Sequence, residues 1–332
     1  APRRHDRGDD PTFDVRADAT AAVTRAVQGR ADAAPGRWAG RAGLAQRRVL
    51  DALCLFHLQA VRTDDVEADI RRLSLTCGID RETVRRSLLA LAADGWITRT
   101  QASSGRRGAR WTADPAGALH TRIAQTLSQA DPRPAGTGAA LRNLLTDPLT
   151  DRLQTAAHDA FAPTGGLGIE AGTLYGKLNE PTDTMTIAIA MSWTMTKAST
   201  NLDRLACCGL IERRDDCWRR AEPSVLDQVA AEQGTQGRGL QRAQRYAVER
   251  AAWAWWQAEL DRMRQRRPRA RTRPRPGLRA RREPPAEPVS GGEPAGWPLH
   301  PRRRNGRADY AAARIALATL RVEHPPIRLR VA

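Results

Sequence analysis

The sequence lacks any long apolar run. No stretch approaches the roughly 20 residues that a transmembrane helix requires, and no secretory signal is present at the start of the chain. The five cysteines are an odd number, which in the absence of such a signal favours reduced thiols over a disulfide framework. These absences predict a cytoplasmic protein without a membrane partner.

A metal site has little support either. Cys207, Cys208 and Cys217 are neighbours in the sequence, but they form no CxxC pair and no histidine is close to them. We therefore expect no metal and no cofactor, with a zinc or redox site at these three thiols as the less favoured alternative.

Lysine is nearly absent, since only Lys177 and Lys197 occur. The formal net charge of +17 therefore comes from arginine. Such a charge suggests a polyanionic partner, but arginine- and alanine-rich usage also follows from a GC-rich genome. The positions of the arginines are consequently better evidence than their number.

One segment repeats at an offset of 114 residues. Residues 70–98 align with residues 184–212 without a gap, which implies that the same supersecondary unit is packed twice. The positions that set the frame pair as Leu73 with Ile187, Ser74 with Ala188, Cys77 with Met191, Val84 with Ala198, Leu88 with Leu202, Leu91 with Leu205, Gly95 with Gly209 and Ile97 with Ile211.

The first copy predicts two helices joined by a tight turn. Gly78 suits a turn that needs a positive φ, and Asp80 can cap the helix that follows. Within that helix, apolar residues at positions 84, 88 and 91 form one buried stripe. The opposite face stays free, and it carries Arg81, Thr83, Arg85 and Arg86.

A β-hairpin should follow this helix. A strand begins at 96–100, residues 103–108 form a flexible basic tip, and 110–112 can return as the second strand. Residues 44–113 resemble the winged helix-turn-helix superfamily, in particular its GntR- and MarR-like bacterial members. The resemblance implies that the second helix enters the DNA major groove while the hairpin, or wing, lies near phosphates. The wing would contribute Arg99, Arg106, Arg107 and Arg110.

The second copy predicts helices over 169–178, 184–191 and 195–207, with a short hairpin over 212–220 that turns at Asp215 and Asp216. Its exposed face is polar rather than strongly basic. Asparagine and threonine can hydrogen-bond to base edges, although such faces also occur as plain solvated surfaces. The candidate DNA contacts are Thr196, Lys197, Ser199, Thr200 and Asn201, with Arg213 and Arg214 in the wing.

The fold class expected is mainly α, with tandem winged helix-turn-helix domains, small β-hairpin wings, a long C-terminal helix and a basic disordered tail. Heptad-like spacing of Tyr246, Trp253 and Leu260 with Trp256 and Met263 suggests either packing on the second winged helix or a homodimer through Gly239–Arg267. Ten arginines and no acid lie in Arg264–Arg282, a composition typical of disorder. The expected segments are an N-terminal arm and short helix (1–43), winged helix 1 (44–113), a helical connector (114–166) with a hinge at Asp131–Gly138 and a helix break at Pro148, winged helix 2 (167–222), a long helix (239–267) and a tail with a short terminal helix (268–332).

No catalytic motif is complete. Gly176-Lys177 lacks the earlier glycine and the following hydroxyl of a phosphate loop, because Ala171 and Leu178 stand there. His300, Arg303 and Tyr310 are similar in order to the HxxR and tyrosine of tyrosine recombinases, but seven residues cannot separate the activating groups from the nucleophile. The chain by itself is therefore not expected to be an enzyme.

Three functional hypotheses remain. The first is sequence-specific binding of double-stranded DNA by both winged helices, in a replication initiator or a transcriptional regulator of a mobile element; tandem winged helices resemble plasmid replication initiators. The second is the DNA-docking part of a larger replication enzyme, such as a primase-polymerase or a helicase, with its catalytic domain before Ala1. The third is a protein-interaction module with degenerate winged helices. Fold alone does not separate these hypotheses.

Overall fold

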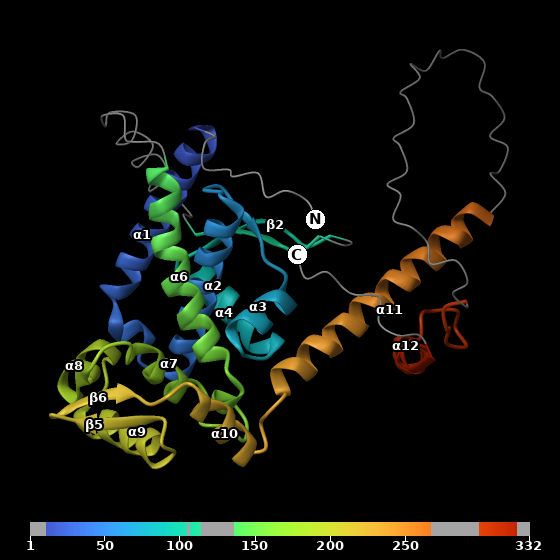
Figure 1. Ribbon diagram of the computed structural model, residues 1–332. Coiled ribbons are helices and arrows are strands. Elements are labelled where there is room, and N and C mark those ends of the chain that lie inside the picture. Colours follow the sequence, from blue (N-terminus) through green and yellow to red (C-terminus); the bar gives the residue numbers. More distant parts are fainter. Residues whose placement is uncertain (1–10, 105–106, 114–135, 267–298, 324–332) are drawn as a thin grey trace. The chain divides into compact units, whose positions relative to one another are not determined.

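The computed structural model describes residues 11–104, 107–113, 136–266 and 299–323. In this part of the chain the fold is mainly helical, with two small three-stranded antiparallel sheets (Figure 1). The expected class, mainly α with small β-hairpins, is therefore confirmed. The chain divides into two compact units, residues 1–241 and residues 242–332. No helix in the described ranges is long and apolar enough to span a membrane.

The first repeat has six elements between residues 41 and 112. In chain order they are α2 (Arg41–Ala60), β1 (Val66–Glu67), α3 (Ile70–Cys77), α4 (Arg81–Ala93), β2 (Thr98–Gln101) and β3 (Arg110–Thr112), and the sheet order is β1-β3-β2. The turn before α4 forms as predicted, because Gly78 has a φ of +67° and the carboxylate of Asp80 accepts a hydrogen bond from the Thr83 amide. The stripe of Val84, Leu88 and Leu91 is buried, which leaves the opposite face of α4 to solvent.

The second repeat has the same six elements in the same order. They are α7 (Gly168–Lys177), β4 (Thr182–Asp183), α8 (Thr184–Met191), α9 (Met195–Cys207), β5 (Ile211–Arg214) and β6 (Cys217–Arg220), with the sheet order β4-β6-β5. Ser192 takes the left-handed conformation that Gly78 takes in the first repeat, with a φ of +48°. The hairpin turns at Asp215 and Asp216 as expected, and both residues have positive φ. Trp111 and Trp218 occupy equivalent places, each in the central strand of its sheet.

The N-terminal segment is more ordered than the sequence suggested. Helix α1 (Pro11–Asp32) is longer than expected and its buried residues Val23 and Val27 belong to the core of the first repeat. Residues 33–43, the end of the expected N-terminal arm, include the 3-10 helix η2 (Pro35–Trp38). Trp38 is buried there, donates from its indole nitrogen to the Ala31 carbonyl at 2.8 Å and packs edge-on against Trp96. The first repeat is therefore completed by α1 and η2.

The connector between the repeats also differs from expectation. Helix α6 (Thr137–Ala157) continues through Pro148 without a break and lies beside α1 (Figure 1). At its start, a Cβ on Gly138 would lie 2.1 Å from the Asp14 carbonyl oxygen, so this glycine permits the close approach of the two helices. Gly138, the last residue of the expected hinge, is therefore held in place against α1. Residues 114–135, with the expected connecting helix and most of that hinge, lie outside the described part of the chain.

Arg48 joins the two repeats from inside the first unit. Its side chain on α2 is buried, and the guanidinium donates to the carbonyls of Ala156 at 2.8 Å and Ile169 at 2.9 Å and to the Thr173 hydroxyl at 3.2 Å. Burial lowers the pKa of Arg48 to about 10. Since these acceptors lie on α6 and α7, the two repeats share one packed body.

The second unit contains most of α11 (Arg238–Arg266) and α12 (Tyr310–Glu323). Ala252 and Trp255 of α11 pack with Ala313 and Leu317 of α12 in a small core. This core uses a different face of α11 from most of the expected heptad positions, because Trp253, Trp256, Leu260 and Met263 are only half-buried. Helix α12 of the expected tail thus packs on the long helix, while residues 267–298, which hold most of the arginine-proline segment, and residues 324–332 lie outside the described residues.

Candidate nucleic-acid interface

The exposed face of α4 is basic, and one acid lies within it. The side chains of Arg85 and Arg86 are 52% and 68% exposed, and Arg81 is exposed beside them. Glu82 accepts two hydrogen bonds from Arg85, at 2.9 and 2.8 Å. This contact lowers the pKa of Glu82 and raises that of Arg85. A base or phosphate that takes Arg85 must therefore displace Glu82, which is easy because both side chains are open to solvent.

Thr83 takes part in the N-terminal cap of α4. Its amide donates to Asp80 at 2.8 Å and its hydroxyl donates to the second carboxylate oxygen at 2.5 Å. The side chain is half-buried. Thr83 therefore secures the N-terminus of α4, and the arginines of this face are the better placed to reach a ligand.

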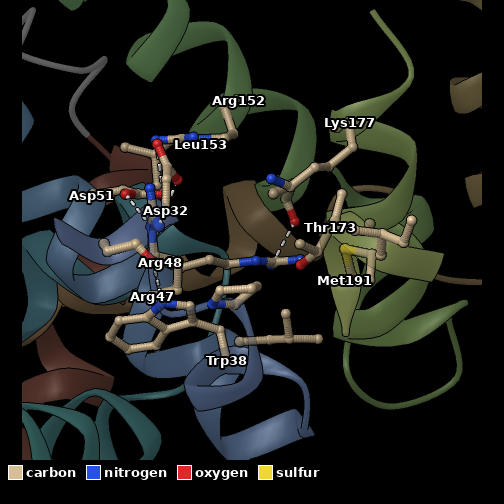
Figure 2. A pocket seen from close by; sticks show the side chains of 18 residues that line it. Asp32, Trp38, Arg47, Arg48, Asp51, Arg152, Leu153, Thr173, Lys177 and Met191 are labelled. Carbon is tan, nitrogen blue, oxygen red and sulfur yellow. Dashed lines mark hydrogen bonds and ion pairs between the residues drawn. The ribbon is translucent and has the colours of Figure 1, made fainter. Parts of the chain in front are cut away.

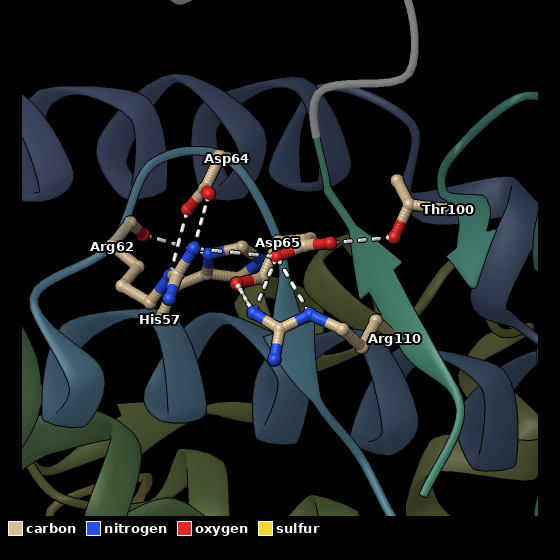
Figure 3. Close-up of polar contacts among 6 residues, drawn as sticks. All are labelled: His57, Arg62, Asp64, Asp65, Thr100 and Arg110. Carbon is tan, nitrogen blue, oxygen red and sulfur yellow. Dashed lines mark hydrogen bonds and ion pairs between the residues drawn. The ribbon is translucent and has the colours of Figure 1, made fainter. Parts of the chain in front are cut away.

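A polar clasp ties the first hairpin to the loop before β1 (Figure 3). Asp65, just before β1, accepts hydrogen bonds from Nε of Arg110 at 2.9 Å and from the Thr100 hydroxyl at 2.7 Å. Arg110 also donates to the Asp65 carbonyl at 3.1 Å. The hydrogen bond from Arg110 lowers the pKa of Asp65. Arg110, which the sequence placed among the phosphate contacts, is thus held in the clasp and sets the direction of the hairpin.

The loop before this clasp is also pinned. Arg62 donates to Asp64 at 2.8 Å, and Nδ1 of His57 on α2 lies 2.8 Å from the Arg62 carbonyl oxygen. Of the predicted wing cations, Arg99 and Arg107 are exposed, whereas Arg106 lies outside the described residues. The hairpin therefore presents Arg99 and Arg107 from a base with a fixed orientation.

The exposed face of α9 is nearly neutral. Lys197 turns back onto α7, where its ammonium lies 2.7 Å from Glu170 and 4.5 Å from the centre of the Trp193 ring. The Asn201 amide donates to the Lys197 carbonyl at 2.9 Å. Thr200 also bonds back to its own helix, at the Thr196 carbonyl, with a distance of 2.8 Å. Thr196 and Thr200 are exposed while Ser199 is half-buried, so hydroxyls dominate this face.

Acids also offset the arginines of the second hairpin. Arg213 pairs with Asp216 at 2.7 Å, and Arg214 lies 3.9 Å from Asp215. Both arginines are exposed, so these pairs can open towards a stronger anion. The two repeats therefore differ in electrostatics, and the stronger positive face belongs to the first repeat.

Sequence reasoning missed the clasp and the competing acid for different reasons. Glu82 precedes Arg85 by three residues, a spacing that places side chains side by side on a helix, so the pair was readable. Asp65 and Arg110 are far apart in sequence, and only the pairing of β1 with β3 brings them together. Among the described residues no cluster of three or more metal-binding side chains occurs, and the five cysteines are free thiols.

Comparison with known proteins gives no match. No protein-family model, curated protein or solved structure matches this chain. The features of the chain that bear on function are the repeated order of its elements and the side chains on the exposed faces of α4 and α9.

Proposed function

We propose that this chain is a sequence-specific double-stranded DNA-binding protein built on two winged helix-turn-helix domains in tandem, and that it acts as a replication initiator or transcriptional regulator of a mobile element. The observation that carries the proposal is α4. It is a capped helix with one buried apolar stripe and an exposed arginine face, inside a unit whose six elements recur in the second repeat. A helix of this kind fits the major groove of B-DNA.

The first repeat supplies most of the affinity in this proposal. Arg81 and Arg85 are the residues that we assign to base edges, because a guanidinium can bond O6 and N7 of guanine together. Arg99 and Arg107 approach phosphates, which contributes affinity that is independent of sequence and sensitive to salt.

The second repeat extends the site. Its hydroxyl-rich face on α9 contributes few charges, so its role is to add contacts at a second half-site rather than to hold DNA alone. Since Arg48 and α6 lock the repeats together, the two half-sites have a fixed separation. A change of that spacing by half a helical turn, about 5 base pairs, should abolish the contribution of the second repeat.

The test is selection of bound duplexes from a random library, followed by titration of the recovered duplex and a scrambled one. Arg85→Ala should weaken binding to the recovered duplex by roughly ten- to a hundredfold, and weaken binding to the scrambled duplex much less. Arg25→Ala is the matched control, since Arg25 is exposed on α1, which is neither of the proposed recognition helices and belongs to neither hairpin. A chain that shows no salt-dependent DNA binding would instead be a protein-interaction module.

A further inference from the structure

A pocket of about 360 Å³ lies between the two repeats, inside the first unit (Figure 2). It is formed by α1, η2, α2 and α6 on one side and by α7 and α8 on the other. Its size falls at the lower end of the range for small-molecule sites. A ligand in this position would touch both repeats at once.

Apolar side chains form most of the wall. Trp38, Leu44, Leu153 and Met191 line the pocket and are buried, and Ala190 lies at an exposed part of the rim. An apolar body of moderate size would therefore be well accommodated, whereas a strongly hydrated ion such as free phosphate would not.

Positively charged side chains outnumber negatively charged ones in the pocket. Four cationic side chains and two carboxylates line it, so two positive charges are in excess. Most of the cations already have partners. Arg47 and Arg152 bond to Asp51 at 2.9 and 3.1 Å, and Arg48 bonds to backbone carbonyls and Thr173.

Lys177 is the exception. Its ammonium points into the pocket in Figure 2, and within the described residues it has no hydrogen bond or ion pair. The Lys177 side chain is exposed to solvent, and partial desolvation of its ammonium, together with the charges of Arg152 and Arg47, lowers its pKa. The pocket is thus a place where an anion would offset the excess of positive charge and find a partner in Lys177.

We propose that this pocket binds a small organic anion, an aromatic carboxylate whose ring lies among the apolar walls and whose carboxylate pairs with Lys177. Such a ligand would act as an effector, because it contacts both repeats and stabilises the arrangement in which α2 faces α7 and α8. This inference goes beyond the proposed DNA binding and does not depend on it, since the pocket can be tested without DNA.

The experiment uses the full chain and three probe pairs: benzoate, 4-tert-butylbenzoate and 2-naphthoate, each with its neutral carboxamide. Calorimetric titration should show saturable binding of at least one carboxylate, at least tenfold tighter than its amide. A saturating concentration, about a hundred times Kd, should raise Tm by roughly 5 °C or more. Binding should weaken as pH rises, because Lys177 then loses its proton.

The chain has two lysines, and Lys197 is the matched control. Lys177→Gln should weaken binding of the carboxylate about tenfold or more, with Lys197→Gln unchanged. Ala190→Phe, a change at an exposed rim position, should obstruct the pocket without loss of the fold. The proposal is overturned by an absence of binding at millimolar concentration, by equal affinity for acid and amide, or by equal effects of the two lysine variants.

Discussion

Asp51→Asn tests how the first unit is held together. Asp51 on α2 is buried and accepts hydrogen bonds from Gln28 of α1 at 3.0 Å and from Arg47 at 2.9 Å, while Arg152 of α6 lies 3.1 Å away. Gln28 closes the network, because its carbonyl oxygen accepts from both arginines. The substitution keeps the shape of the side chain and removes the charge that both guanidinium groups face.

The expected cost is large for a single isosteric change. Removal of one partner from a buried ion pair costs about 3–5 kcal/mol. The Arg152 side chain is 31% exposed and asparagine retains some hydrogen bonds, so we expect about 2–3 kcal/mol here. For a unit of this size such a loss lowers Tm by roughly 5–10 °C.

Asp64→Asn is the matched control. Arg62 holds the pKa of Asp64 at about 2, which alone would suggest a strong contribution to stability. Its side chain is 62% exposed, however, so water screens the pair and the expected loss is below about 1 kcal/mol.

Urea unfolding of both variants and the parent at several pH values completes the assay. Burial alone would raise the pKa of Asp51, but the charges of Arg152 and Arg47 and the hydrogen bonds from Arg47 and Gln28 together lower it. A lowered folded-state pKa contributes stability above the unfolded pKa, near 3.9, and loses it as pH falls further. The gap between parent and Asp51→Asn should therefore be constant from about pH 7 to 5 and narrow below about pH 4. Equal losses for the two variants, or a gap that stays constant into acid, would refute this account.

Three further predictions concern a tight turn, the packing of α12 and the charge of the α4 face. Both Gly78 and Gly95 have a φ of +67°, but only a Cβ at position 78 would clash, since it would lie 2.5 Å from Ala157. Gly78→Ala should therefore lower the free energy of unfolding by about 3 kcal/mol or more, and Gly95→Ala by only about 1 kcal/mol. Equal losses in thermal unfolding would contradict this packing. Removal of residues 299–332 should expose Trp255 and red-shift its fluorescence, and unchanged emission would show that α12 does not cover it. Glu82→Gln should strengthen binding to a scrambled duplex, since it removes a negative charge from the face of α4, and unchanged binding would place that face away from DNA.

The sequence predicted the helices and turns within each repeat better than it predicted how the two repeats pack together. Helices α8 and α9 begin and end at the expected residues, because capping side chains and apolar spacing are local signals. The turn at Asp215 and Asp216 follows from the same kind of local chemistry. These features do not depend on where the rest of the chain lies.

The assembly depends on contacts between distant segments. Gly138 was interpreted as part of a hinge because glycine is typical of hinges, yet here it allows α6 to approach α1. Arg48 stands within the apolar stripe of α2 and was a readable sign of a buried cation, but its acceptors on α6 and α7 lie about a hundred residues further along. The sequence also could not show that Arg110 bonds to Asp65, because an arginine in solvent and one held by a distant carboxylate look the same in a sequence.

The central claim is that the arginine face of α4 reads bases, and one measurement addresses it directly. In the recovered duplex, each guanine is replaced in turn by 7-deazaguanine, which lacks the N7 acceptor, and binding of the parent and of Arg85→Ala is measured at one salt concentration. If Arg85 bonds a guanine, one replacement should weaken the parent about tenfold and leave Arg85→Ala unaffected, so the two changes are not additive. If every replacement weakens both proteins equally, Arg85 does not contact guanine N7 and the account of α4 as the helix that reads the sequence is contradicted.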